Sequence, residues 1–438
     1  MYIYLLSILT AICLGIVKPC LATNLIDVYQ DALKNDAVYQ AAVSTRLSMR
    51  ETLPQRVAAL LPSINGQANL ASNYQNITQA PSADPLGIST FPSRGVSIAI
   101  KQPLFDSGGW FAIKQASSTS KQADAILMSA TQALIYRVAS AYFKVLLAKD
   151  NLRLAQSETT ANAKQLEQAQ KRVRVGLDAI TSVYDAKAAY DKSLAAEITV
   201  QNALRNSQEG LRQLTGQTYA KLSGFRNKLP LLRPQPTNVE QWITTATTYN
   251  LTLIASRYGL EAARNNIKIK ASGHLPTVNL VGSYGRDNGI NAGTTNRNSA
   301  VVGLQLEVPL FSGGAIVSNT RQAQYDFQTT SANLDNTYRQ VMVTTRQKYN
   351  DVLADISRIQ AEYQAVKSAQ LSLASTEESF KAGIRTIVDV LLAQQNLYDA
   401  KRNTAKDQYT YLLDSLALKQ EAGTLKPDDL AQINQWLL

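Results

Sequence analysis

The sequence predicts a mainly helical, duplicated chain that also carries four membrane β-strands, and three observations lead to this fold class. Helix-favouring residues fill unusually long runs: the 67 residues from Gly109 up to Gly176 contain no proline. Shorter stretches alternate apolar and polar residues with a period of two, as strands between two different environments do. Both kinds of segment occur twice in the same order, 206 residues apart at Pro103 and Pro309.

Residues 1–22 have the features of a secretory signal peptide. An apolar run extends from Tyr2 to Val17, and small residues before Thr23 suit cleavage after Ala22, although no Lys or Arg precedes the run. A lipid anchor at Cys20 or a retained membrane anchor are the alternatives. Cleavage would remove both cysteines of the chain and leave neither a disulfide nor thiolate chemistry.

The first repeat is predicted over residues 23–215. It begins with a helical pattern and continues with strands at about 63–74 and 95–103, separated by an exposed loop. A long helix then runs to a turn at Gly176, and another returns to about Leu214. At 1.5 Å per residue, the outgoing helix alone is about 100 Å long.

The second repeat is predicted over residues 239–423, after an irregular joint at 216–238 that is rich in proline and glycine. It has strands at about 277–285 and 299–310 and a helical hairpin with its tip at Gly383. Residues 424–438 form a short C-terminal tail.

The two glycine turns are expected to be equivalent helix ends. Gly176 and Gly383 each follow a long helical run and suit the left-handed conformation that ends a helix. Each also stands six residues before a polar position, Ser182 or Asp389. The pairing predicts two helical hairpins whose tips lie at one end of the molecule.

Four strands per chain are too few for a membrane barrel. The smallest such barrels have about eight strands, and an open sheet in lipid would leave its edge amides unpaired. Strands in a membrane would therefore require a shared barrel, with eight strands from a dimer or twelve from a trimer, continued by a tube of packed helices. The alternative, a soluble α+β protein, would explain the alternation of apolar and polar residues in the strands. It would explain neither the length of the helices nor the export signal.

Composition argues against nucleic acid and against catalysis. The net charge is +11, but Lys and Arg are spread along the helices without a basic run, as on a solvated helical surface. The single histidine, His274, has no companion at metal-ligand spacing, and no acid–base cluster is evident. We expect no cofactor, no metal and no enzymatic activity.

The layout and several motifs resemble the TolC family, the outer-membrane exit ducts of Gram-negative bacteria. The matching motifs are Val28-Tyr29-Gln30, Leu61-Pro62, Val175-Gly176-Leu177 with Ala179-Ile180-Thr181, His274-Leu275-Pro276-Thr277, Arg321-Gln322-Ala323-Gln324-Tyr325 and Arg385-Thr386-Ile387-Val388-Asp389-Val390-Leu391. The resemblance implies a homotrimer with a shared twelve-stranded outer-membrane barrel and a periplasmic coiled-coil tunnel. Residues 216–238 and the C-terminal tail would form a belt around its middle.

The resemblance also implies partners and a function. Such ducts dock onto a periplasmic adaptor protein and an inner-membrane transporter of the RND, ABC or MFS class, and they export drugs, toxins or proteins. The sequence does not distinguish between drug efflux and type I protein secretion. A trimeric coiled-coil surface protein of the adhesin kind is the alternative from another class, but its strands would be expected at one chain end.

Further implications concern the periplasmic entrance. Asp389 matches an acidic ring at the constriction, whereas Leu392 stands where a second acidic position is expected, which predicts weak cation selectivity. Arg385 and Thr181 match one polar link that holds the closed state. Phe380 and Ser182 replace the tyrosine and aspartate of another link, so the gate is expected to depend on Arg385. The adaptor-contacting tips would be Val175, Gly176, Leu177, Ala382, Gly383 and Ile384.

Overall fold

The structure is a computed structural model that describes residues 23–78, 87–225, 229–289 and 296–437. The predicted signal peptide lies outside the described residues. The chain divides into two compact units, described here one by one: Met1–Ala42, Met128–Asn250 and Gln340–Leu438 form the first, and Val43–Leu127 and Leu251–Arg339 the second. No helix among the described residues is long and apolar enough to cross a membrane.

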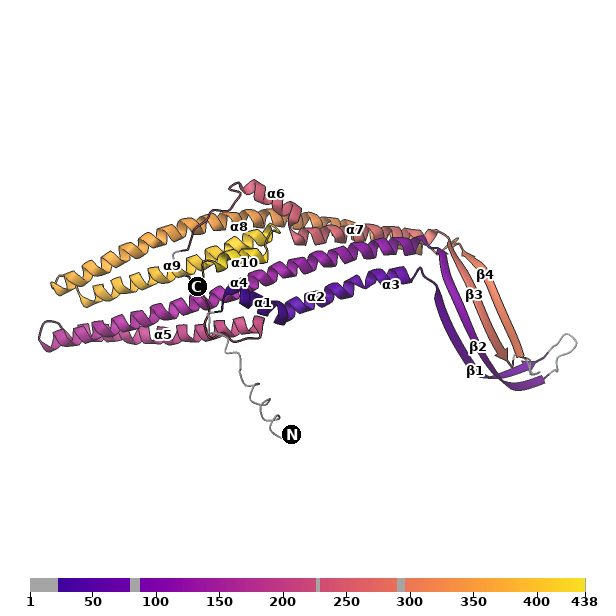
Figure 1. Cartoon of the computed structure of the whole chain (residues 1–438), viewed down its shortest axis with the longest axis horizontal. Coiled ribbons are helices and arrows are strands. Elements are labelled where there is room, and N and C mark those ends of the chain that lie inside the picture. The colour runs from indigo at the N-terminus through magenta and orange to yellow at the C-terminus, as the bar shows by residue number, and fades with distance from the viewer. Residues whose placement is uncertain (1–22, 79–86, 226–228, 290–295, 438) are drawn as a thin grey trace, which may run out of the picture. The chain divides into compact units, whose positions relative to one another are not determined.

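The second unit contains a four-stranded antiparallel sheet with the order β1-β2-β3-β4 (Figure 1). Its strands are β1 (Ser63–Ile77), β2 (Gly87–Phe105), β3 (Thr277–Asn288) and β4 (Asn296–Glu307). Short helical elements precede each strand pair: α2 (Ala37–Arg50), which begins in the first unit, α3 (Thr52–Ala58), α7 (Leu251–Ala271) and η1 (Ser272–His274). The four antiparallel strands and the duplicated order agree with the predicted fold class.

The strand register gives the sheet one apolar and one polar face. Ile64 pairs with Ile100, and Tyr284 pairs with both Ile98 and Ala300, so apolar side chains line up across the strands. Many of these side chains are exposed in the single chain; Leu304 is 70% exposed. The intervening positions carry polar residues such as Asn, Gln and Ser.

The strand bounds differ from those expected. β1 continues to Ile77 and β2 begins at Gly87, so most of the predicted loop before residue 95 is paired strand. Polar cross-strand contacts support this extension, for example the hydrogen bond that the Asn73 side chain donates to Ser93 Oγ at 2.7 Å. β4 spans Asn296–Glu307 and not 299–310, because Pro309 lacks the amide that a further ladder bond needs.

The first unit is a helical bundle with a large apolar core. It contains the following helices, wholly or in part: α1 (Leu25–Asn35), α4 (Ser107–Arg174), α5 (Ile180–Thr215), α6 (Val239–Tyr249), α8 (Ala315–Lys381), α9 (Ile387–Glu421) and α10 (Pro427–Asn434). Phe143 lies at the centre of the core, with its ring centroid 5.9 Å from that of Tyr142 and 5.8 Å from that of Tyr409. Both rings and the leucines around them are buried.

The irregular joint is attached to this bundle by hydroxyl groups. Tyr142 donates a 2.7 Å hydrogen bond to the carbonyl of Ser223. Tyr411 donates to the carbonyl of Leu232 at 2.9 Å and accepts from its amide at 2.8 Å. A segment without regular structure is thereby fixed at the bundle surface, because its backbone groups find side-chain partners.

The helical pattern from Leu25 to Leu60 forms three helices and not one. The first break is at Asp36, whose carboxylate accepts hydrogen bonds from Arg137 at 2.9 and 3.0 Å and from the amide of Tyr39 at 2.6 Å. Burial raises the pKa of Asp36, but these hydrogen bonds outweigh it and hold the pKa below its ordinary value. A side chain that caps the following helix thus ends the preceding one.

Candidate functional site

The turns of the two helical hairpins have the same backbone structure. Gly176 and Gly383 adopt left-handed conformations with φ of 74° and 77°. In the first turn the amide of Leu177 donates to the carbonyl of Arg172 at 2.9 Å, and that of Gly176 to Val173 at 3.0 Å. The second turn repeats both bonds, from Ile384 to Ser379 and from Gly383 to Phe380. Both are Schellman motifs, in which glycine avoids the strain of a positive φ.

The two tips lie next to each other at one end of the first unit (Figure 1). A small apolar cluster beneath them joins both hairpins; its buried members are Ala169, Ala186, Phe380, Ile387 and Val390. Phe380 is only 6% exposed. The hairpins are therefore packed together just behind their turns.

Arg172 of α4 connects the two hairpins through a charged and an aromatic contact. Its Nε lies 3.0 Å from Oδ2 of Asp178, which belongs to the first turn. Its guanidinium also lies over the ring of Phe380 of α8, 4.7 Å from the ring centroid. The side chains of Arg172 and Asp178 are 25% and 21% exposed, so the contact is largely shielded from water. Sequence reasoning missed this link, because Arg172 and Asp178 read as ordinary helix-end charges.

Asp389 belongs to a capping box at the start of α9. Its Oδ2 accepts from the amide of Thr386 at 2.9 Å, while its own amide donates to Thr386 Oγ1 at 3.3 Å. The backbone and hydroxyl hydrogen bonds from Thr386, and then the charge of Arg385, lower the pKa of Asp389. The carboxylate is therefore ionised at neutral pH.

Arg385 contacts Asp389 within its own chain. Its Nη1 lies 3.6 Å from Oδ1 of Asp389, and its side chain is 60% exposed. In the described part of the chain no hydrogen bond joins Arg385 to Thr181, whose side chain is exposed. The implied link between Arg385 and Thr181 is thus not formed in the single chain.

Phe380 and Ser182 stand where the resemblance expects the tyrosine and aspartate of the other link. No hydrogen bond joins them in the described residues, as expected for a phenyl ring, but Phe380 is not an empty position in the link. Its ring is buried in the cluster and accepts the Arg172 guanidinium on its face.

Leu392 lies on α9 and is 57% exposed. It lines a groove of about 440 Å³ between α4, α5 and α9, together with Val388 and Leu391. Leu392 therefore leaves part of its apolar surface uncovered in the single chain.

The tips themselves present apolar side chains. Val175, Leu177 and Ile384 are 69%, 65% and 78% exposed. Ala382 and the two glycines beside them are exposed as well. The ends of both hairpins therefore expose apolar surface in the single chain.

A polar seam behind the tips also joins the two hairpins and was missed by sequence reasoning. The amide of Gln394 in α9 donates to Asn162 Oδ1 in α4 at 2.7 Å, and both side chains are buried. Further along, Arg402 of α9 forms an ion pair with Glu158 of α4 at 2.7 Å. Polar residues at buried helical positions could not be distinguished from solvated ones by periodicity alone.

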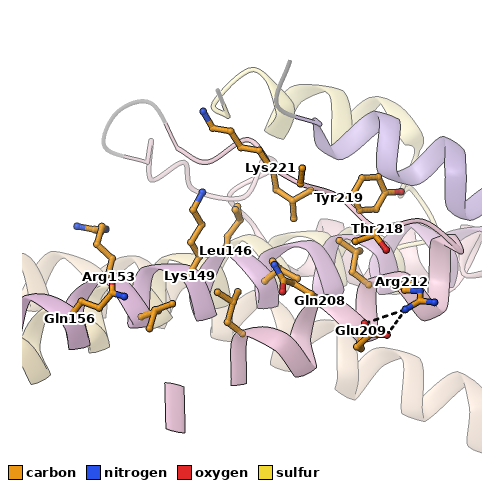
Figure 2. A pocket seen from close by; sticks show the side chains of 16 residues that line it. Leu146, Lys149, Arg153, Gln156, Gln208, Glu209, Arg212, Thr218, Tyr219 and Lys221 are labelled. Atoms are coloured by element: carbon orange, nitrogen blue, oxygen red, sulfur yellow. Dashed lines mark hydrogen bonds and ion pairs between the residues drawn. The ribbon is translucent and has the colours of Figure 1, made fainter. Parts of the chain in front are cut away.

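A second groove, of about 450 Å³, lies where α4, α5 and the joint meet. Figure 2 shows Lys149 on α4 and Lys221 on the joint at its border, while Arg212 on α5 pairs with Glu209 at 3.3 Å. Its floor is apolar and includes Leu146. No sequence-predicted site residue lies there.

The chain matches the family profile described as outer membrane efflux protein at residues 28–217 and 242–424, one match in each repeat. It is 37% identical to the outer membrane protein TolC of Vibrio cholerae, over 99% of this chain and 98% of that one. It is 35% identical to TolC of Escherichia coli, over 95% and 85% of the two chains. The proteases secretion protein PrtF of Dickeya chrysanthemi is 29% identical, with coverage of 95% and 91%.

Solved structures share the fold. The outer membrane protein VceC of Vibrio cholerae superposes with a TM-score of 0.77 at 20% identity, covering 91% of this chain and 96% of that one. The CmeC outer membrane channel of Campylobacter jejuni gives 0.79 at 17% identity, with coverage of 94% and 89%. The duplicated helical hairpins, the four-stranded sheet and the match along both repeats establish that this chain belongs to the TolC family of outer-membrane efflux and secretion channels, which are not enzymes.

Proposed function

We propose that three copies of this chain form a gated duct that exports drugs, toxins or proteins from the periplasm through the outer membrane. Each copy contributes a four-stranded sheet with one exposed apolar face, and three such sheets supply twelve strands to a closed barrel. Closure pairs the outer edge of β1 with that of β4, and among the described residues neither edge has a partner strand. The helical hairpins then continue the duct into the periplasm.

The hairpin tips form the periplasmic entrance in this proposal. Three copies of Asp389 make one ring of carboxylates, and three copies of Leu392 make an apolar ring one helical turn further along α9. The ion pair between Arg385 and Asp389, 3.6 Å long, is the observation that carries the proposal. Each Asp389 carboxylate then faces the pore with the Arg385 guanidinium beside it. This positive charge weakens the attraction of the ring for cations in solution.

The closed entrance is held within each chain by the contact of Arg172 with Phe380 and by the polar seam. Opening requires the α8–α9 hairpin to move away from the α4–α5 hairpin, which separates these groups. A partner opens the duct only if it binds the open tips more tightly than the closed ones.

The partner at the tips is a periplasmic adaptor protein, which joins the duct to an inner-membrane transporter of the RND, ABC or MFS class. The exposed Val175, Leu177 and Ile384 supply the apolar contact area. The Schellman turns fix the backbone that carries those side chains, so little backbone entropy is lost on docking.

The test is the single-channel conductance and ion selectivity of the purified protein in planar bilayers under a salt gradient. Arg385→Ala removes the cation beside Asp389 and should increase both the conductance and the preference for cations. Lys381→Ala is the matched control, because Lys381 also stands near the tip but pairs with Glu378 at 2.7 Å. An Arg385→Ala channel identical to the wild type in both properties would refute the proposed entrance.

A further inference from the structure

Two arginines interrupt the apolar face of the sheet, which continues beyond them on β1 and β2 with the exposed Tyr74 and Ile88. Along β3, Val278, Leu280 and Tyr284 share one face, and Arg286 is the next residue on it. Arg286 is eight residues beyond Val278, or about 26 Å of strand, which is close to the length of a membrane-spanning strand. Arg94 of β2 lies on the same face in the adjoining row, because it pairs with Asn288 and Leu70.

The two arginines border a shallow groove of about 500 Å³ on that face. They are diagonal neighbours on adjacent strands, which places their Cα atoms roughly 7–8 Å apart. Leu70 and Val96 give the groove an apolar floor, and Asn288 and Asn296 contribute amide groups. Arg94 and Arg286 complete this part of the lining. The groove therefore combines cationic and amide donors with apolar surface.

Neither guanidinium has an acidic partner among the described residues. The carboxylate nearest in sequence, Asp287, lies on the opposite face, where its side chain extends over Gly95 beside Asn69. Arg94 and Arg286 are both exposed. Two guanidinium groups on neighbouring strand positions repel each other, and an anion bound between them removes that repulsion.

We propose that this groove binds the phosphate headgroup of an anionic lipid in the outer leaflet of the outer membrane. The groove is at the end of the sheet far from α3 and α7, the end that faces outward in a channel whose helices extend into the periplasm. The phosphate lies between Arg94 and Arg286, and an acyl chain lies along Leu70 and Val96.

The positive charges of Arg94 and Arg286 are complementary to the negative charge of a lipid phosphate. Guanidinium groups bind phosphate oxygens through paired hydrogen bonds, and the Asn288 and Asn296 amides can donate to the same oxygens. Tyr284 lies directly below Arg286 on the same face, at the level where aromatic rings mark a membrane interface. A soluble anion would gain nothing from the exposed Leu70, which is 81% exposed in the single chain.

The test is native mass spectrometry of the detergent-purified full-length protein with diphosphorylated lipid A as the probe. The wild type should retain the lipid, each of Arg94→Gln and Arg286→Gln should lose roughly 5-fold in affinity, and the double variant roughly 25-fold. Arg297→Gln is the matched control: Arg297 pairs with Asp287 in the register and lies on the polar face at the same height. It should bind as the wild type does.

Two further experiments test whether the whole lipid is bound, and not a free phosphate, and whether the loss of binding results from misfolding. Inorganic phosphate at millimolar concentration should not displace the lipid, and efficient displacement would overturn the proposal. Arg94→Lys with Arg286→Lys keeps the charge and should recover part of the affinity in a channel of normal thermal stability. Equal loss in the Arg297→Gln control, or undiminished binding by the double glutamine variant, would also overturn it.

Discussion

The contact between Arg172 and Phe380 should hold the entrance closed, and Phe380→Leu tests this role. Leucine keeps an apolar side chain in the cluster but removes the aromatic face above which the guanidinium lies, 4.7 Å from the ring centroid. Arg172→Gln removes the charge from the other side. Both variants should shift the channel toward the open state, because the contact joins α4 to α8.

The size of the shift follows from the environment of the contact. A cation–π contact that is largely desolvated contributes about 1–2 kcal/mol, and the Arg172 side chain is 25% exposed. The ion pair with Asp178 belongs to the same hairpin, so it orients Arg172 without opposing the separation. Three protomers in the proposed trimer give about 3–6 kcal/mol, a change of roughly 10² to 10⁴ in the ratio of open to closed channels.

The assay is the open probability of single channels in planar bilayers for the wild type, both variants and the double variant. The double variant should open little more than either single one, because each change already removes the shared contact. Phe380→Tyr keeps the ring and should stay closed. Arg174→Gln is the charge control, since that side chain is exposed and donates to the carbonyl of Gln170 in its own helix. Additive effects of Arg172→Gln and Phe380→Leu would refute the coupling.

Four further outcomes follow from the structure. Leu392→Asp adds a second acidic ring and should raise the preference for cations several-fold in reversal-potential measurements; an unchanged potential would place Leu392 outside the pore. Asn162→Leu leaves the buried Gln394 amide without its partner and should cost about 1–3 kcal/mol in denaturant unfolding, largely recovered when Gln394→Leu is added. Thr386→Ala breaks the capping box and should cost about 0.5–2 kcal/mol, seen as faster amide exchange at the start of α9. Burial, together with the charge of Asp414, raises the pKa of Asp355 to about 6, so the folded state binds its proton more tightly than the unfolded chain. Thermal stability should therefore fall as pH rises from about 4 to about 6, and Asp355→Asn should abolish that slope.

Much of the fold could be predicted from the sequence because its signals are long and repeated. Helix propensity summed over tens of residues, and strands with a period of two, leave few alternatives. Gly176 and Gly383 were informative for a local reason, since only a residue without Cβ reaches their φ without strain. The strand ends were less predictable. The polar residues around Asn73 and Ser93 suit a solvent-exposed loop, but they can equally form cross-strand hydrogen bonds in a hairpin.

The candidate site residues stay a prediction, and the sequence could not indicate the contacts that they make. Asp389 serves as a cap and carries an ion pair, and within the single chain Arg385 contacts Asp389 and not Thr181. The link through Arg172 depends on two helices whose contact is set by tertiary packing, far apart in sequence. Periodicity gives the face of a helix, but not which side chain on a neighbouring helix it meets.

A trimeric duct requires three copies of Leu392 to converge in one pore, and this convergence can be measured. Both natural cysteines lie within the predicted signal peptide, so Leu392→Cys would give one thiol per mature chain. Three thiolates at the constriction should bind Cd²⁺, and micromolar Cd²⁺ should block the single-channel current until a chelator is added. Leu371→Cys, an exposed position on α8, should be labelled by thiol reagents without Cd²⁺ block. A Leu392→Cys channel that is labelled but conducts unchanged in Cd²⁺ would contradict a trimeric duct closed at its hairpin tips.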